Sequence, residues 1–549
     1  MTDAATPQGA GTARTLPGLI ARHARERPDA TALVAGARRI GWAELDALGR
    51  SASGWLAAQG VREGDRVAIW MTNRVEWLAL LLGLARLGAT AVAVNTRFRA
   101  AELAYLLQRS GARLLVTERD SRKVDFAGVL RDVDPAALAA LERVATVGAD
   151  DGADDAFDAH GRPVVAFDAD GRRDPGAPDR SAPDAIAMLF TTSGTTKGPK
   201  LVMHAQRTLA YHAGHVARAT GLHEEGACLL AALPLCGVFG MCGVLAAFAA
   251  GAPVVLQDVF DAPEAARLVR GHAITHLFGS DEMFLRLLEC GRGPDPFPSA
   301  RLFGYGAFRA DGFDIAREAW TRGVPLFGLY GSSEVQALFS IQPRGLPVDE
   351  RIRGGGRPSS GDEVEVRVRD AETGELLPPG RSGDLEIRGP GNFVGYLDDP
   401  AATREAIGDD GFFRTGDLGF LRDDGTFVYQ TRRGDAMRLG GYLVDPSEIE
   451  TELRRLPGVA DAQVVPVDLG GQWRCAAFVV AAPGVAIDPA ALVAGLSGRV
   501  APYKLPARVW PIDAFPTTPS ANGTKIQRAK LREMARSRIG EERAAGGPA

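Results

Sequence analysis

Apolar residues along the first part of the chain alternate between helical and strand spacing. Leu16–Arg27 and Ala43–Gln59 repeat apolar positions every three or four residues, which is typical of amphipathic helices. Short apolar runs between such helices predict buried strands. These patterns predict two further helices, at Glu76–Leu87 and Ala101–Ser110. They predict strands at Arg66–Trp70, Ala89–Val94, Arg113–Thr117 and Ala185–Phe190. Strands that alternate with helices predict parallel sheets covered on both faces.

The pattern changes twice further along the chain. A second alternating set runs from His204 to about Tyr330. Glu363–Arg369 and Gly383–Arg388 then alternate residue by residue, as half-buried antiparallel strands do. From Asp435 onward the pattern predicts a smaller α+β unit. Its predicted elements are a helix at Pro446–Leu456, strands at Ala460–Asp468 and Cys475–Ala481, and a basic helix after Lys525.

One long uncharged stretch, Ala227–Gln257, could be taken for a membrane helix by its length alone. Prolines and glycines break it into pieces too short to cross a bilayer. We predict a strand end and loop at Leu229–Phe239, a buried helix near Met241–Ala250, and a buried strand at Pro253–Leu256. We therefore expect no membrane span.

Composition narrows the class of protein. The 549 residues carry a formal charge of −5 with both signs mixed, so we expect no nucleic-acid partner. The five cysteines are odd in number and contain no CxxC pair, which favours a reducing compartment over a disulfide framework. The first 15 residues have the composition of a flexible tail and not of a signal peptide. We expect a cytoplasmic protein.

The loop Thr191–Lys200 is the first candidate for chemistry. Behind a buried strand it combines hydroxyl groups, glycines and lysines, which suits an anion cradle of backbone N–H groups. A polar surface turn is the weaker alternative, and the Walker pattern GxxxxGK[ST] is absent. The loop residues that we assign to nucleotide binding are Thr191, Thr192, Ser193, Gly194, Thr195, Thr196 and Lys200.

This loop resembles the phosphate-loop signature of the adenylate-forming superfamily, which includes acyl-CoA synthetases, luciferases and peptide-synthetase adenylation domains. The family pattern has Gly where Lys197 stands here. The resemblance runs from about Leu16 to Glu533. It implies an α/β fold with a large N-terminal domain of two helix-flanked sheets and a small distorted β-barrel, followed by a smaller mobile α+β C-terminal domain. It also implies ATP, Mg²⁺ and coenzyme A as cofactor and co-substrates.

A second signature, Tyr330-Gly331-Ser332-Ser333-Glu334, follows an apolar strand at Pro325–Leu329. The resemblance implies that the ring of Tyr330 stacks on adenine, that Ser333 contacts the α-phosphate and that Glu334 binds magnesium. A hard cation prefers carboxylate oxygen, which fits the last role. We place Gly331 and Ser332 in the nucleotide site with them.

A third signature is Arg414-Thr415-Gly416-Asp417. A lone aspartate after glycine is more often a turn residue. By resemblance, Asp417 would hold both ribose hydroxyls and Arg432 would assist. A carboxylate can accept two hydroxyl donors, which suits this role.

The segment Arg432–Glu450 resembles the family's hinge region. The resemblance implies a hinge over residues 433–435, centred on Gly434, between an N-terminal domain at 16–432 and a C-terminal domain at 436–549. Glycine at this position would loosen the hinge. Gly440, Gly441 and Tyr442 would line the coenzyme A channel.

The last signature, Asn522-Gly523-Thr524-Lys525-Ile526-Gln527-Arg528, carries the residue that resembles the family's catalytic lysine. A solvated lysine near a C-terminus is usually surface, and Thr524 is an extra residue relative to the common form. By resemblance Lys525 is catalytic together with Glu334, Thr192 and Lys200, because a cation would stabilise charge on the carboxylate and α-phosphate.

The substrate region departs from the family. Gly237 stands where acyl-CoA synthetases usually have a gating histidine, and Cys236 precedes it. We interpret Cys236 as an inert packed thiol and not a nucleophile. Tyr305 places a large side chain at a position where members of the family often have a small one. The acyl pocket predicted from these residues contains Cys236, Gly237, Tyr305, Gly306 and Gly331, and Ala307 lies beside the nucleotide with Gly306.

Together, the motifs and the resemblance predict an ATP-dependent carboxylic acid–CoA ligase that works through acyl-AMP. We expect a short, cyclic or aryl acid in place of a long fatty chain. Loading of the acyl group on a carrier-protein thiol stays as the alternative, and a catalytically silent nucleotide-binding protein is a weaker one. The expected partners are a small carboxylic acid, ATP and CoA, and a homodimer is left open.

Overall fold

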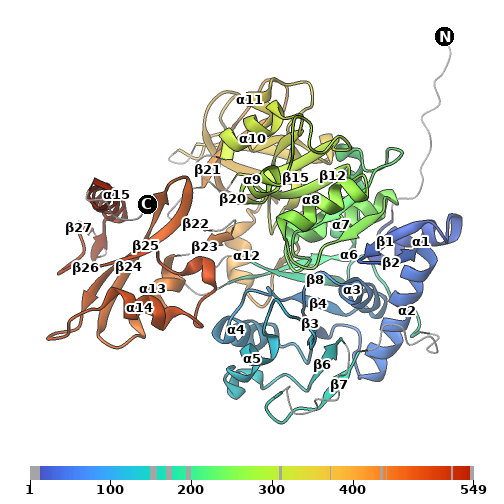
Figure 1. Cartoon of the computed structure of the whole chain (residues 1–549), viewed down its shortest axis with the longest axis horizontal. Helices are drawn as coiled ribbons and strands as arrows, with labels where there is room; N and C mark the ends of the chain where they lie inside the picture. Colours follow the sequence, from blue (N-terminus) through green and yellow to red (C-terminus); the bar gives the residue numbers. More distant parts are fainter. Residues whose placement is uncertain are drawn as a thin grey trace.

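The computed structural model describes residues 13–148, 158–167, 176–192, 199–307, 312–370, 373–432, 437–439, 442–444, 446–520 and 523–544. Two large sheets flanked by helices make up most of the molecule, and a smaller unit follows them in the chain (Figure 1). The predicted α/β fold class is therefore confirmed.

The first sheet has eight strands in the order β19-β9-β8-β4-β3-β5-β6-β7. Its strands are β3 (Arg66–Trp70), β4 (Thr90–Ala93), β5 (Leu114–Glu118), β6 (Arg143–Val147), β7 (Val164–Ala166), β8 (Ile186–Thr191), β9 (Leu201–Ala205) and β19 (Gly395–Tyr396). β3 pairs in parallel with β4 and β5, as the alternation predicts. β9 pairs antiparallel with β8 and β19, so this edge is mixed where a parallel sheet was expected.

The second sheet has thirteen strands and passes from a parallel centre into an antiparallel end. Its parallel part contains β1 (Thr31–Ala35), β10 (Leu229–Ala231), β11 (Val254–Leu256), β12 (His276–Ser280), β13 (Leu302–Gly306) and β14 (Leu326–Ser332), with β2 (Arg38–Gly41) antiparallel at the edge. The antiparallel end contains β15 (Gln336–Ile341), β16 (Gly355–Pro358), β17 (Glu365–Arg369), β18 (Gly383–Arg388), β20 (Phe413–Leu421) and β21 (Phe427–Arg432). These last strands stand where the small β-barrel was expected.

Helices pack against both large sheets (Figure 1). Those in the first half are α1 (Leu16–Glu26), α2 (Trp42–Ala58), α3 (Val75–Leu87), α4 (Ala100–Ser110), α5 (Phe126–Arg131), α6 (Gln206–Thr220) and α7 (Val238–Ala250). Those that follow are α8 (Ala262–Gly271), α9 (Asp281–Glu289), α10 (Gly312–Thr321), α11 (Val348–Arg351) and α12 (Pro400–Ala406), and short 3₁₀ turns complete the set. α3 and α7 are buried over most of their length, and they share one hydrophobic core with α1, α2 and α6.

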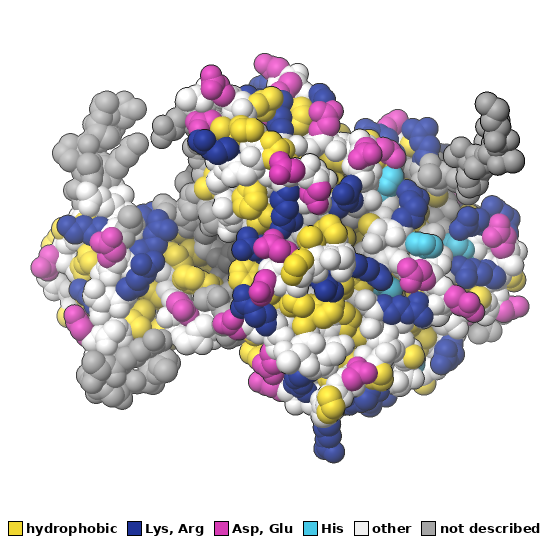
Figure 2. Space-filling model, turned by 90° about the horizontal axis from the view of Figure 1, so that it is seen from above, with side chains coloured by type: hydrophobic (Ala, Val, Ile, Leu, Met, Phe, Trp, Pro, Cys, Tyr) yellow, Lys and Arg dark blue, Asp and Glu magenta, His cyan; other side chains and the backbone are white. Residues whose placement is uncertain are grey.

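The uncharged stretch forms the three pieces that its glycines and prolines predict. β10, α7 and β11 are each short, and α7 has 13 residues. In the part of the chain that the structure describes, no helix has the length and apolar character that a bilayer crossing requires. On the face drawn in Figure 2, basic and acidic side chains are interspersed around a hydrophobic area.

The C-terminal unit has its own hydrophobic clusters. It contains β22 (Met437–Leu439), β23 (Tyr442–Val444), α13 (Pro446–Arg454), β24 (Val459–Leu469), β25 (Gln472–Ala481), α14 (Pro489–Leu496), β26 (Arg508–Pro511), β27 (Thr517–Ser520), β28 (Gly523–Ile526) and α15 (Arg528–Ala544). β22 and β23 lie toward the large sheets, whereas β27 and α15 lie on the far side (Figure 1). An ion pair of 2.7 Å between Lys504 and Glu102, at the start of α4, joins the two parts.

Candidate active site

The predicted phosphate loop connects two antiparallel strands. β8 ends at Thr191 and pairs with Leu201 at the start of β9. The loop is closed at its base, because the Thr192 amide donates to the Lys200 carbonyl oxygen at 2.9 Å and the Lys200 amide donates to Thr192 Oγ1 at 3.1 Å. Four predicted loop residues lie outside the described part of the chain: Ser193, Gly194, Thr195 and Thr196.

Lys200 and Glu334 are brought together by a tyrosine that the sequence did not single out as a site residue. The ammonium of Lys200 lies 4.5 Å from the ring centroid of Tyr396. The hydroxyl of the same Tyr396 donates a hydrogen bond of 3.0 Å to Glu334 Oε1. A lysine and a carboxylate from segments more than 100 residues apart thus contact opposite parts of one side chain.

The Tyr330–Glu334 segment begins as the end of β14 and then turns into β15. Ser332 Oγ accepts hydrogen bonds from the amides of Glu334 and Val335, at 3.2 and 3.4 Å. The His204 ring nitrogen Nε2 donates to the Ser333 carbonyl oxygen at 2.7 Å. A side chain at Gly331 would place Cβ 2.5 Å from the Gln336 carbonyl oxygen, so only glycine fits this turn.

Tyr330 and Asp417 face each other across the antiparallel end of the second sheet. The tyrosine hydroxyl donates to Asp417 Oδ2 at 2.6 Å, and both residues are buried. The ring of Tyr330 packs edge-on against Phe427 and tilted against Tyr429, with centroids 5.2 and 5.6 Å away. Arg432 lies directly opposite Asp417 in the β20–β21 ladder, and its role beside the ribose stays a prediction.

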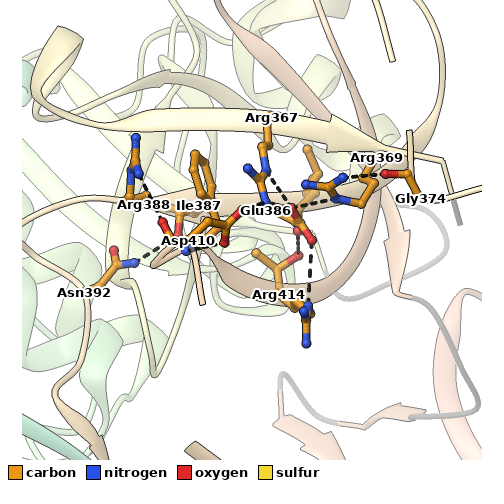
Figure 3. A network of polar contacts seen from close by, with 12 residues as sticks. Arg367, Arg369, Gly374, Glu386, Ile387, Arg388, Asn392, Asp410 and Arg414 are labelled. Carbon is orange, nitrogen blue, oxygen red and sulfur yellow. Dashed lines mark hydrogen bonds and ion pairs between the residues drawn. The ribbon is translucent and has the colours of Figure 1, made fainter. Parts of the chain in front are cut away.

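A group of arginines around Glu386 fixes the strand next to Asp417 (Figure 3). Glu386 Oε2 accepts from Arg367 Nε at 2.6 Å and Arg369 Nε at 3.2 Å, and Arg414 lies 3.9 Å from the other oxygen. The register of the β18–β20 ladder shifts between Asp384 and Glu386, and there Thr415 Oγ1 donates to the Leu385 carbonyl oxygen. This bulge presents Asp417 at the site.

Lys525 lies in β28, opposite Thr518 of β27. Figure 1 places β27 on the far side of the C-terminal unit from β22 and β23. The structure therefore does not bring the Lys525 hairpin to the Tyr330–Glu334 segment. Tyr442 begins β23, and Gly434, Gly440 and Gly441 lie outside the described residues. The hinge and its boundaries stay predictions.

The substrate region corrects one prediction. Tyr305 does not add bulk to an acyl pocket as predicted, because its ring is buried in the core beside α9 and α10 and its hydroxyl donates to the Ile352 carbonyl oxygen at 2.6 Å. Gly304 faces the other side of β13, against Leu329 and Phe278. Gly306 and Ala307 follow at the end of β13 and are half-buried.

Gly237 immediately precedes α7 and is half-buried. A Cβ there would meet its nearest neighbour, the Pro234 carbonyl oxygen, at an ordinary 3.4 Å. At Gly240 the same oxygen would be only 2.3 Å away. Backbone crowding therefore requires glycine at 240 but not at 237, and the missing side chain at Gly237 leaves space.

Burial governs the ionisable groups that support the site. It lowers the pKa of His204 and His212 to about 4, so both rings are neutral and can donate to the Ser333 and Ala337 carbonyl oxygens. Burial also raises the pKa of Cys236 to about 11, which keeps this thiol protonated near neutral pH.

The described residues contain no cluster of three or more carboxylate, imidazole or thiol groups that could enclose a metal ion. A magnesium ion that binds together with ATP needs only one or two carboxylate ligands from the protein, because waters and phosphate oxygens supply the others. The single half-buried carboxylate of Glu334, with one oxygen already accepting from Tyr396, fits this kind of site.

Two residues of this assembly, His204 and Tyr429, carry no signal that sequence patterns alone reveal, and Tyr396 carries only a weak one. Each acts through a contact with a distant segment. The pair Gly395-Tyr396 resembles part of the family order, and that was the one clue to Tyr396.

Two family models match the chain. The AMP-binding enzyme model matches residues 20–397, and the model of the AMP-binding enzyme C-terminal domain matches residues 448–522. The first covers more than half of the chain, in the region that holds Lys200, Glu334 and Tyr396.

Curated relatives span nearly the full length. A 3-[(3aS,4S,7aS)-7a-methyl-1,5-dioxo-octahydro-1H-inden-4-yl]propanoyl:CoA ligase of Mycobacterium tuberculosis is 34% identical and covers 95% of this chain and 99% of its own. A 2-succinylbenzoate–CoA ligase of Geobacillus kaustophilus is 31% identical, with 95% and 98% covered. A feruloyl-CoA synthase of Amycolatopsis is 32% identical, with 93% and 97% covered.

Two solved structures of o-succinylbenzoate CoA synthetase from Bacillus subtilis, each 25% identical to this chain, also match. A double mutant with its product analogue OSB-NCoA gives a TM-score of 0.76, with 94% of this chain and 98% of the other covered. The complex with the acyl-adenylate intermediate OSB-AMP gives 0.63, with 93% and 97% covered. The chain belongs to the AMP-binding enzyme family, in its group of AMP-forming acid–CoA ligases.

Proposed function

We propose that this protein joins a ring-bearing carboxylic acid to coenzyme A in two half-reactions, with acyl-AMP as the intermediate. One observation carries the proposal. Lys200, Glu334 and Asp417 come from distant segments, yet Tyr396 links the first two and Tyr330 links Asp417 to the strand that leads into Glu334. A cation, a metal-binding carboxylate and a diol-binding carboxylate are the groups that ATP needs.

In the first half-reaction a carboxylate oxygen of the acid attacks the α-phosphorus of ATP. A new O–P bond forms, and the bond from that phosphorus to the bridging oxygen breaks and releases pyrophosphate. Glu334 would hold Mg²⁺, which neutralises phosphate charge when it is bound. Lys200, the amides at the base of the loop and Lys525 would stabilise the negative charge on the transferred group.

In the second half-reaction the thiol of CoA attacks the acyl carbon of the mixed anhydride. The C–S bond forms, AMP leaves, and the thiol proton is lost to solvent. The arrangement of the two parts supports this step, since β22 and β23 lie toward the large sheets and the Lys525 hairpin lies away (Figure 1). The higher TM-score to the structure that holds a CoA product analogue than to the acyl-adenylate complex points the same way.

The acid class rests on the space at Gly237 and on the names of the relatives. Those names describe acyl groups that contain a ring: an indene bicycle on a propanoyl arm, a succinylbenzoate and a feruloyl group. Gly237 leaves room next to the N-terminus of α7, without any backbone requirement for glycine. We therefore propose a cyclic or aryl acid with a short carboxyl-bearing arm as the substrate.

ATP–pyrophosphate exchange over a panel of acids tests this proposal. The panel includes arylpropanoates, bicyclic propanoates, short linear acids and palmitate. We expect exchange with ring-bearing acids, and a clear preference for palmitate would contradict the acid class. Lys525→Ala should abolish most of the exchange but spare thioester formation from supplied acyl-AMP. Equal losses in both half-reactions would contradict the role given to Lys525.

A further inference from the structure

Tyr396 lies on a two-residue strand at the edge of the first sheet. β19 pairs antiparallel with β9, which places Tyr396 opposite Val202. The Tyr396 amide donates to Thr403 Oγ1 at 2.9 Å, and the ring packs against Phe393 with centroids 4.9 Å apart. Only 6% of the residue is exposed. The backbone and ring of Tyr396 are thus fixed by contacts that involve neither Lys200 nor Glu334.

The two ends of this fixed side chain carry different interactions. The ring face attracts the Lys200 ammonium at 4.5 Å, a cation–π distance. The hydroxyl donates to Glu334 Oε1 at 3.0 Å. Glu334 is also held through its backbone, because the Phe393 amide donates to the Glu334 carbonyl oxygen at 2.7 Å.

We propose that Tyr396 is a positioning residue that sets the carboxylate of Glu334 for magnesium and the ammonium of Lys200 for phosphate. This inference rests on the proposed function, because it assigns those two ligands to the site. Tyr396 acts through these two side chains and itself touches neither the metal nor the nucleotide.

The Tyr396 hydroxyl holds one oxygen of the Glu334 carboxylate. A glutamate side chain has several rotamers, and a half-buried one that must bind a metal loses affinity if it samples them all. The hydrogen bond to Oε1 restricts the carboxylate and leaves Oε2 for the cation. Groups that orient a metal ligand in this way typically contribute about 10- to 100-fold to metal affinity or activity. Donation to a carboxylate also polarises the phenol, which makes its ring face a better site for the lysine.

A purely structural role is the competing explanation, because Tyr396 belongs to the hydrophobic cluster around β18 and β20. The Tyr396→Phe substitution distinguishes the positioning role from a purely structural one. It keeps the ring, and with it the packing and the Lys200 contact, and removes only the hydroxyl. A matched control is Tyr211→Phe, since the Tyr211 hydroxyl also donates at 3.0 Å to a glutamate, the exposed Glu363, which has no proposed role in binding ATP or magnesium.

The experiment measures ATP binding by calorimetry on the full chain, with EDTA and over a series of Mg²⁺ concentrations. We expect Tyr396→Phe to raise the Mg²⁺ concentration at half-maximal enhancement by about tenfold and to leave metal-free ATP binding unchanged. Tyr211→Phe should match the wild type in both. Tyr396→Leu, which also removes the ring face, should weaken metal-free binding as well.

An unchanged Mg²⁺ requirement in Tyr396→Phe would overturn the inference. An equal loss with and without Mg²⁺ would do the same, because it would indicate a structural role. Failure of the proposed function is distinguishable: the wild type would bind ATP in a Mg²⁺-dependent way but show no acid-dependent pyrophosphate exchange. A wild type that does not bind ATP would contradict both.

Discussion

The hydroxyl of Tyr330 donates a 2.6 Å hydrogen bond to Oδ2 of Asp417 and joins β14 to β20. The two residues lie 87 positions apart in the chain. The proposed adenine-stacking ring and the proposed ribose-binding carboxylate therefore depend on each other for position.

Substitutions at this pair should separate the two contributions to ATP binding. Asp417→Asn removes the charge that accepts both ribose hydroxyls, and we expect the KM for ATP to rise about tenfold, the effect of losing a hydrogen bond to a charged group. Tyr330→Phe keeps the stacking ring and should raise the KM only a few-fold. Steady-state kinetics at fixed acid and CoA measure both values. A larger effect from Tyr330→Phe than from Asp417→Asn would be inconsistent with the assignment.

Gly331→Ala should disrupt the turn that leads into Glu334. Its Cβ would lie 2.5 Å from the Gln336 carbonyl oxygen and 2.6 Å from Ala337 Cα, so the backbone has to move. We expect a loss of about 1–3 kcal/mol in unfolding free energy, together with most of the exchange activity. Denaturant unfolding and pyrophosphate exchange check this. Gly345→Ala is the control, because a Cβ at Gly345 meets nothing within 4 Å, and comparable losses in both variants would refute the steric argument.

Sequence patterns were sufficient to predict those helices and strands of the first domain that are long or strongly apolar. β3 has the predicted bounds, and α3 begins one residue earlier than predicted. β19 was missed because it has only two residues, and β9 was missed because it pairs antiparallel with β8 across the phosphate loop, which an alternation of strands and helices does not predict. The motif residues were identifiable because clustered glycines, hydroxyls and charges are unusual behind buried strands.

The error at Tyr305 has a simple physical cause. Side chains along a strand point alternately to its two faces, so Tyr305 must face away from Gly304 and Gly306. The glycines face one side of the sheet, and the tyrosine fills the core on the other. His204 and Tyr396 were not identifiable in this way, because each contributes through a contact 129 or 62 residues away.

Stability should fall as the pH is lowered from about 6.5 toward 4. Burial lowers the pKa of His204 and His212 from 6.5 to about 4. In this range the unfolded chain binds protons at these rings and the folded protein does not, so acid favours unfolding. The stability contributed by the neutral rings is complete above pH 6.5 and is lost through this window.

His204→Gln should therefore lessen the pH dependence of unfolding free energy by at most about 1.4 kcal/mol per pH unit between pH 6 and 4.5. The glutamine amide can still donate to the Ser333 carbonyl oxygen. Urea unfolding at a series of pH values measures the slope. An unchanged slope would mean that His204 does not titrate as its burial predicts.

The ion pair between Lys504 and Glu102 should favour the arrangement in which the Lys525 hairpin is turned away. The two side chains are 8% and 16% exposed, and their charged atoms are 2.7 Å apart. Glu102→Gln keeps an acceptor for the Arg99 amide, which the glutamate also binds, but removes the charge. We expect slower thioester formation from supplied acyl-AMP with little change in pyrophosphate exchange.

Lys504→Gln should give the same separation of the two half-reactions, measured in single-turnover assays. The exposed ion pair Arg267–Glu264 supplies a control, because it does not join the C-terminal unit to the large sheets. Glu264→Gln should therefore alter neither half-reaction. If the Glu102 and Lys504 variants slowed adenylation as much as thiol transfer, the pair could not be assigned to one arrangement.

Product identification tests the central claim most directly. The purified protein is incubated with ATP, Mg²⁺ and the best ring-bearing acid of the panel, with CoA in one reaction and a holo carrier protein in another, and the products are identified by mass spectrometry. The proposed function predicts acyl-CoA, AMP and pyrophosphate in equal amounts, and no acylated carrier. Formation of ADP, or acylation of the carrier without acyl-CoA, would contradict it.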